Sequence, residues 1–236
     1  MEQHLDLESV IPGMFRWFAP VGWNQGRGLW GGLVVAACVK AVEMLQQEQD
    51  GSRSIRSVGA HLCGAVQSGS CTVEVSCLRA GSAMSTWQTI IRGASDETYA
   101  TATVVTGAAR PNAHTPAAVG VRAPDVPSWR DASEVPIGPP YGPEFSRNLR
   151  YRPVEGFPGS AADPRTVGWI QRQDTGHTRA WTAASLLGIV DAWWPATYAS
   201  FPSVMELRPM ATVAFHGHLL EEPGAVPASE PLLFES

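Results

Sequence analysis

Asp191, in the second half of the sequence, is the leading candidate for acid–base chemistry. It directly follows the apolar run LLGIV, and a later segment that contains Thr212, RPMATVAFHGH, has side chains that alternate in character. A carboxylate placed after a run of core-forming residues is expected to lie partly in low-dielectric surroundings, which raise its pKa toward that of a useful base. The alternative interpretations are an exposed acid at a helix end for Asp191 and an ordinary β-branched strand residue for Thr212.

A glycine-rich segment, WNQGRGLWGG, offers a different kind of chemistry just before a helical pattern begins. It ends in Gly31 and Gly32. Unpaired N–H groups at the start of a helix favour a developing oxyanion, and glycine lets a substrate carbonyl approach the backbone closely. Asn24 in the same segment adds a side-chain donor. Close packing of two helices on the glycines, and a plain loop role for Asn24, are the alternatives.

Three further sets of polar residues, an arginine, two histidines and two serines, are judged as site residues by their neighbours in the sequence. Arg79 stands at a predicted strand end, where its planar guanidinium suits a phosphate group or an acid on a neighbouring strand. His216 and His218 share one side of a predicted strand without a visible third ligand, so we interpret them as surface residues and expect no metal. Ser82 and Ser85 lack the Gly-x-Ser-x-Gly context, which argues against a serine hydrolase.

The composition of the chain favours a globular protein and argues against nucleic-acid-binding and membrane-spanning proteins. The chain has 236 residues, 44% of them hydrophobic and 17% charged, which is ample for a packed core. Its formal charge of -5, without any cluster of Lys and Arg, argues against a nucleic-acid partner. The apolar runs are too short to cross a bilayer, and the first residues lack the pattern of a signal peptide. We therefore expect a cytoplasmic protein with free thiols, no membrane span and no cofactor.

The first half of the sequence predicts an α+β layer. A helix is expected over residues 33–47, where apolar residues recur at steps of three and four without Gly or Pro. Segments rich in β-branched residues follow, separated by short turns that indicate an antiparallel meander. These predicted strands are 55–65, 71–79, 84–92 and 98–107.

The second half repeats the same order on a shorter scale. Two predicted strands precede a helix, and strand-like sequence follows that helix. The corresponding segments are 145–156, 166–174, 179–194 and 205–222. A Pro-, Ala- and Gly-rich stretch joins the halves, so we predict units at 1–110 and 146–236 with a linker at 111–145. Such repetition suggests an internal duplication whose second unit has fewer strands.

Four segments resemble the double-hotdog acyl-CoA thioesterase family. The glycine pair opening the first helix, a strand with an Arg and a Gly, a Trp-containing strand, and a helix acid followed by a Thr carry the resemblance. These segments are LWGGLVVAACVKAV, VEVSCLRAGSAMSTWQTIIRG, GWIQRQD, and ASLLGIVDAWWPA with RPMATVAFHGH. The resemblance implies two tandem hotdog folds joined edge to edge, the C-terminal one incomplete, in a protein that commonly forms homo-oligomers.

The same resemblance implies an activity and its residues. The family hydrolyses fatty acyl-CoA thioesters with a water molecule held by an Asp, a Thr and a Gln. Asp191 and Thr212 match the first two by motif, whereas the sequence has no counterpart of the Gln. Asn24, Gly31, Gly32 and Arg79 would then bind the acyl-CoA substrate.

Two other functions remain open on the same fold. Hotdog hydratases and dehydratases need an acid and a His on a loop before a helix, and Asp174 and His177 precede the second helix at a spacing that does not match that motif. A protein that binds acyl groups or acyl-CoA without catalysis would be favoured by the missing Gln.

Overall fold

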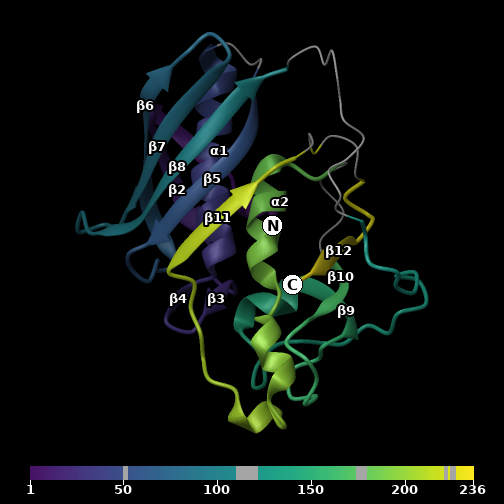
Figure 1. Cartoon of the computed structure of the whole chain (residues 1–236). Helices are drawn as coiled ribbons and strands as arrows, with labels where there is room; N and C mark the ends of the chain where they lie inside the picture. Colours follow the sequence, from purple (N-terminus) through teal and green to yellow (C-terminus); the bar gives the residue numbers. More distant parts are fainter. Residues whose placement is uncertain (50–52, 110–121, 174–179, 221–222, 224–226) are drawn as a thin grey trace.

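The computed structural model describes residues 1–49, 53–109, 122–173, 180–220, 223 and 227–236. It contains a seven-stranded sheet, a three-stranded sheet, a two-stranded hairpin, and two α-helices that lie side by side (Figure 1). The helices are α1 (Gly31–Gln49) and α2 (Ala183–Ile189). The strands of the first half are β1 (Leu7–Ile11), β2 (Met14–Ala19), β3 (Asn24–Gln25), β4 (Gly28–Leu29), β5 (Arg53–Leu62), β6 (Gly69–Ala80), β7 (Met84–Arg92) and β8 (Thr98–Ala108). Those of the second half are β9 (Leu149–Glu155), β10 (Val167–Arg172), β11 (Ala214–His218) and β12 (Leu232–Glu235).

The large sheet has the strand order β1-β2-β6-β7-β8-β5-β11, and every neighbouring pair is antiparallel. It wraps over α1, which contacts β5, β6, β7 and β8 on one side and α2 on the other (Figure 1). From Leu33 to Val42 every residue except Lys40 is buried. A helix that is covered on both sides needs apolar or small residues all round, and this segment supplies them.

The predicted helix and the four strands that follow it in the first half are present, with ends shifted by a few residues. The sequence analysis did not find the hairpin that β1 and β2 form before this helix. Gly13 makes its turn with a φ of +80°, a conformation that glycine adopts readily. The alternating burial along β2 places Phe15 and Trp17 in the core, where both are fully buried.

The second half repeats the topology of the first. In each half, two antiparallel strands precede the helix, one strand follows it, and a later strand pairs with the second of the first two. Thus β9, β10, α2, β11 and β12 correspond to β1, β2, α1, β5 and β6. Within the described residues of the second half, nothing corresponds to β7 and β8, which in the first half lie between β6 and β5.

The two halves join through β5 and β11, which pair in antiparallel register with His216 opposite Gly59. This edge-to-edge joint extends the sheet of the first half by one strand of the second (Figure 1). On β11, Phe215 and Gly217 face the core, whereas His216 and His218 are exposed.

The helix of the second half is shorter than the predicted segment. It begins after Thr182, whose hydroxyl accepts a hydrogen bond from the Ser185 amide while the Ser185 hydroxyl accepts one from the Thr182 amide. Such a reciprocal cap stabilises the first turn. The helix ends at Ile189 and continues as a 3-10 turn, Val190–Ala192. The prediction that a strand carries Thr212 was wrong, because β11 begins at Ala214.

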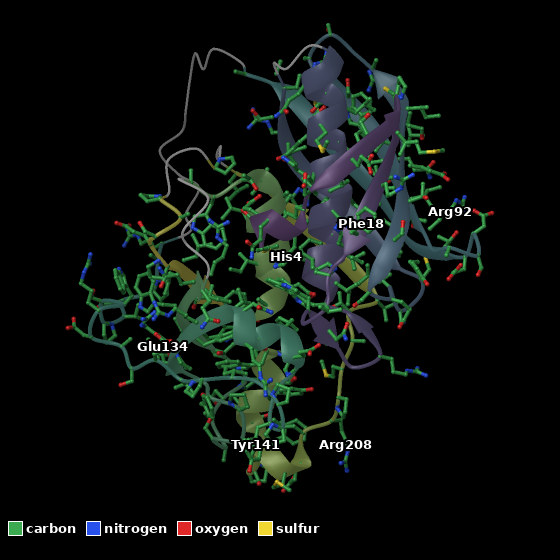
Figure 2. The ribbon with its side chains drawn as sticks, turned by 180° about the vertical axis from the view of Figure 1, so that it is seen from behind. His4, Phe18, Arg92, Glu134, Tyr141 and Arg208 are labelled. Carbon is green, nitrogen blue, oxygen red and sulfur yellow. The ribbon has the colours of Figure 1, made fainter. Side chains whose placement is uncertain are left out.

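The described part of the predicted linker packs against the second half. Val135 pairs with Tyr151 of β9, and the Glu134 carboxylate accepts hydrogen bonds from Arg150 and Arg152 at 3.2 and 2.8 Å. Figure 2 shows Glu134 and Tyr141 on the surface of the second half, seen from behind. Among the described residues, no helix has the length and apolarity needed to cross a bilayer.

Candidate active site

Asp191 lies in the 3-10 turn that follows α2, where the chain passes from the buried helix to the surface. The preceding Val190 is exposed, whereas Ala192 is buried, so Asp191 stands at the boundary and is half-buried. Its Oδ1 accepts a hydrogen bond from the Thr212 hydroxyl at 2.7 Å. The structure therefore brings together the two residues that the sequence nominated, although they belong to different loops.

Gly31, the first residue of α1, borders this pair. A Cβ on Gly31 would lie 2.9 Å from Asp191 Oδ2, 2.8 Å from Leu62 Cδ1 and 3.2 Å from Thr212 Cβ. No side chain fits at these distances without displacing its neighbours. Glycine at this position lets the carboxylate of the second half touch the helix start of the first half.

Burial sets the protonation of Asp191. It raises the pKa of the carboxyl from 3.8 to about 6, while the Thr212 hydroxyl and the Gly32 amide act in the opposite direction by favouring the charged form. Oδ2 is buried and makes no hydrogen bond to any residue that the structure describes. A carboxyl with a pKa near 6 and one oxygen without a protein partner can accept a proton near neutral pH.

Gly32 has a different surrounding from Gly31. A Cβ on Gly32 would collide with the carbonyl oxygen of Gly188 in α2 and with the ring of Trp30, and a Cβ on Gly188 would lie 2.6 Å from the carbonyl oxygen of Gly32. The two glycines thus allow α1 and α2 to cross in close contact. Of the two interpretations of the glycine pair, helix packing describes Gly32, and proximity to the acid describes Gly31.

The amides at the start of α1 precede its hydrogen-bond ladder. Leu33 and Val34 donate the first bonds, both to the carbonyl of Trp30, at 3.1 and 3.3 Å. The amides of Gly31 and Gly32 come before these donors, at the positive end of a 19-residue helix. They lie near the Asp191 carboxylate, because a Cβ on Gly31 would be 2.9 Å from its Oδ2.

Trp30 is a site residue that the sequence analysis did not find. Its indole N–H donates a hydrogen bond to the backbone oxygen of Asp191 at 3.0 Å. The only available signal was the position of an aromatic residue immediately before the glycine pair, and that position does not indicate a partner far along the chain. The Gln25 side chain adds another link by donating to the Met210 carbonyl at 3.1 Å.

The other nominated residues lie apart from Asp191. Asn24 belongs to the β3–β4 hairpin, where its backbone N–H donates to the Glu144 carboxylate at 3.4 Å. Arg79 is exposed on β6 beside a bulge, and β7, β8 and β5 separate that strand from β11. Among the described residues no acid forms an ion pair with Arg79. The structure does not bring Asn24 or Arg79 into contact with the Asp191–Thr212 pair.

The remaining candidates do not form a second centre. The rings of His61 and His216 lie 6.3 Å apart on the seam of the sheet, and no group of three or more metal-binding side chains occurs in the described part of the chain. Ser85 is buried and accepts a hydrogen bond from Arg53. Asp174 and His177 lie outside the described residues.

The family comparison concerns the first half. Residues 19–107 match the family model described as the acyl-CoA thioesterase N-terminal domain. They cover α1, Gly31 and the strands β5 to β8. This part of the chain belongs to the acyl-CoA thioesterase N-terminal domain family. No protein of curated function matches the sequence.

Solved structures extend the likeness to the whole chain. A conserved protein with a hot dog fold from Alicyclobacillus acidocaldarius has a TM-score of 0.82 at 19% identity, covering 99% of this chain and 84% of its own. A candidate thioesterase II from Thermobifida fusca has a TM-score of 0.78 at 20% identity, with coverages of 99% and 84%. The tesB protein of Mycobacterium avium subsp. paratuberculosis has a TM-score of 0.74 at 17% identity, with coverages of 99% and 83%.

These likenesses confirm the predicted fold class. The thioesterase-type domain is followed by a second unit of the same topology, and the chain as a whole is an α+β double hotdog. In the C-terminal hotdog, the described residues provide no counterparts of β7 and β8.

Proposed function

We propose that this protein hydrolyses acyl-CoA thioesters to a free acid and CoA, with Asp191 as the base that activates water. The observation that carries the proposal is the half-buried Asp191 carboxylate, held by Thr212 against the glycine-led start of α1. The thioesterase-type domain over residues 19–107 supports the choice of a thioester as the substrate.

The proposed reaction needs no covalent intermediate with the protein. Asp191 removes a proton from a water molecule, whose oxygen attacks the thioester carbonyl carbon. The carbonyl oxygen becomes an oxyanion, which the amides of Gly31 and Gly32 stabilise at the helix start. When the tetrahedral intermediate collapses, the carbon–sulfur bond breaks and the proton on Asp191 passes to the CoA sulfur.

The residues of the site have separate roles in the proposed hydrolysis. Thr212 donates to Oδ1, and Oδ2, which has no partner among the described residues, is the oxygen that would take the proton from water. Gly31 allows substrate and acid to approach the same helix start. Asn24 and Arg79 remain sequence-based candidates for substrate binding, and Arg79 on β6 would serve only a distant part of the ligand. A cytoplasmic location and homo-oligomeric assembly also remain predictions of the sequence.

A panel of saturated acyl-CoAs of different chain length, assayed by the release of free thiol, tests the proposal. Release by the wild-type protein that is lost in Asp191→Asn supports it. Hydration of crotonyl-CoA without thiol release would instead identify a hydratase. Tight acyl-CoA binding with neither reaction would identify a binding protein and overturn the proposal.

A further inference from the structure

The indole of Trp30 connects the first hotdog to the peptide that carries Asp191. Trp30 immediately precedes α1, and its Nε1–H donates to the backbone oxygen of Asp191 at 3.0 Å across a separation of 161 residues. Asp191 is therefore held twice, through its backbone by Trp30 and through its side chain by Thr212. Each partner comes from outside the turn in which Asp191 lies.

The Trp30 side chain is itself locked in place. It is fully buried, and its ring stacks between Trp23 and Phe145, with ring centroids 6.0 and 4.6 Å away and interplanar angles of 17° and 7°. Phe145 belongs to the second half, in the 3-10 helix Glu144–Asn148. An indole sandwiched in this way cannot turn without displacing both neighbours, so its N–H points in one direction.

We propose that Trp30 is a positioning residue, whose indole N–H fixes the Asp191 peptide so that the carboxylate stays between Gly31 and Thr212. The proposal rests on the function proposed above for Asp191. The turn Val190–Ala192 is only three residues long, and its first residue is exposed. Without an outside donor, the peptide would be free to rotate and carry the carboxylate away from the helix start.

A structural role alone would have different consequences from a positioning role. Loss of one hydrogen bond in a stack that keeps its other contacts affects stability modestly, whereas misplacing a catalytic group by about 1 Å can cost about 100-fold in rate. The groups that act on the pKa of Asp191, apart from burial, are the Thr212 hydroxyl, the Gly32 amide and the Trp30 indole, none of which carries a charge. The indole N–H, which donates to the backbone oxygen of Asp191, also lowers the pKa of the nearby carboxyl. Its removal should therefore raise that pKa while the carboxyl stays buried.

The test compares Trp30→Phe with Trp23→Phe, which removes an indole from the same stack without touching Asp191. We expect Trp30→Phe to lower kcat for acyl-CoA hydrolysis by roughly 10- to 100-fold with little change in KM. The midpoint of its rise in kcat/KM with pH should move upward. Trp23→Phe should retain the kcat and the pH midpoint of the wild type.

A second variant covers the case in which phenylalanine disturbs the fold. Benzothienylalanine, introduced at position 30 by nonsense suppression, keeps the two-ring shape of tryptophan and lacks the N–H. It should reproduce the loss in kcat and the pH shift with wild-type thermal stability. A kcat within about twofold of Trp23→Phe, a change confined to KM, or a pH midpoint that stays or falls would overturn the proposal.

A titration that needs no turnover separates this inference from the proposed function. In protein labelled with 13C at the aspartate carboxyls, Asp191 is assigned by its absence in Asp191→Asn, and its pKa is followed by NMR. If the wild-type protein hydrolyses no acyl-CoA, the proposed function fails. An upward shift of the Asp191 pKa in the position-30 variants, absent in Trp23→Phe, would still support the contact-dependent positioning.

Discussion

At each end of the helix pair α1–α2, a partly buried carboxyl in or just after one helix lies near the start of the other, but the two carboxyls have different neighbours. At one end, the Asp191 carboxyl lies against the start of α1, where the Gly32 amide lowers its pKa. At the other end, the Glu43 carboxyl of α1 lies near the start of α2, where the Ala184 amide has the same effect. Burial nevertheless raises the pKa of both carboxyls, to about 6 for Asp191 and about 7 for Glu43.

The neighbours of the two carboxyls distinguish the ends. Asp191 meets a hydroxyl and a glycine, and no ammonium or guanidinium group acts on it. Glu43 has the Lys40 ammonium 4.0 Å away. Beside it, the Glu2 carboxylate accepts a hydrogen bond from the Thr182 hydroxyl at 2.7 Å.

The N-terminal residues close the Glu43 end. Met1 and Leu5 are buried, and Glu2 lies 3.5 Å from the buried guanidinium of Arg172. Figure 2 shows His4 of this segment close to the helix pair. A buried carboxyl with a raised pKa at a helix start is therefore not sufficient to mark a site, because structural groups produce the same shift. The uncharged partners and the glycine distinguish the Asp191 end.

The largest expected effect comes from replacing the acid at each end of the helix pair by the residue with the corresponding side-chain amide. Asp191→Asn should lower kcat/KM for acyl-CoA hydrolysis by about 10²- to 10⁴-fold, because the base is lost while the shape is kept. Glu43→Gln is the matched control and should hydrolyse acyl-CoA at the wild-type rate. Thiol release measured for both variants decides the comparison, and equal losses in the two would contradict the assignment of the site to Asp191.

Alanine should affect the acid directly at Gly31 and the helix packing first at Gly32. Gly31→Ala places a methyl group against Oδ2 of Asp191 and should lower kcat/KM by about 10- to 100-fold, because the acid is displaced. Gly32→Ala forces apart α1 and α2 and should lower the free energy of unfolding by about 1–3 kcal/mol. Urea denaturation and thiol release of both variants test this. A loss of activity in Gly31→Ala that only follows a loss of folded protein would contradict it.

The pH dependence of stability should reflect the Glu43 carboxyl. Burial raises its folded-state pKa from 4.5 to about 7, an effect to which Glu2 adds and which Lys40 opposes. Between these values the folded protein holds a proton that the unfolded chain releases, so stability is present below pH 4.5 and is lost as the pH rises through about 7. Glu43→Gln stays neutral and should remove a fall on the order of 1–3 kcal/mol.

Denaturation at pH 4.5 and pH 8 measures this effect in the wild type and in Glu43→Gln. Asp191 contributes a parallel fall between pH 3.8 and about 6, so the double variant with Asp191→Asn should have the flattest profile. An identical pH dependence in the wild type and Glu43→Gln would show that the Glu43 pKa is not raised in the folded protein.

The smallest expected effect concerns the threonine at each end. Thr212→Val removes the hydrogen bond to Asp191 and should lower kcat/KM about 10-fold, because the carboxylate is less well oriented. The pH midpoint should rise, because that bond favours the charged acid. Thr212→Ser should restore both. Thr182→Val, which removes the cap of α2, should instead cost about 0.5–2 kcal/mol of stability and leave the rate unchanged.

Sequence periodicity predicted the regular elements of the first half well. The helix with apolar residues at steps of three and four, and the strands β5 to β8 bounded by short turns, occur within a few residues of their expected positions. The β1–β2 hairpin was missed because its strands are short, and the first of them is exposed along most of its length. A short exposed strand has little alternation to detect, and its pairing with β2 determines its structure.

The candidate site was predictable only in part. Asp191 could be nominated because it follows a core-forming run, and Thr212 because its segment resembles the motif of the thioesterase family. Arg79 and Asn24 had equally suitable side chains, yet the topology places them on other elements, away from that pair. The position of Trp30 before the glycine pair did not indicate its partner, because that partner lies in the other half of the chain.

The sequence by itself determined the local elements, since backbone geometry and exposure leave a short-range period in the order of apolar residues. Only the tertiary structure decided that Asp191 bonds to an uncharged hydroxyl, whereas Glu43 lies beside a lysine. This difference depends on the crossing of α1 and α2 at Gly32 and Gly188, and on contacts such as Trp30 with Asp191 and Glu2 with Thr182. Contacts between such distant residues follow from packing, which no local pattern encodes.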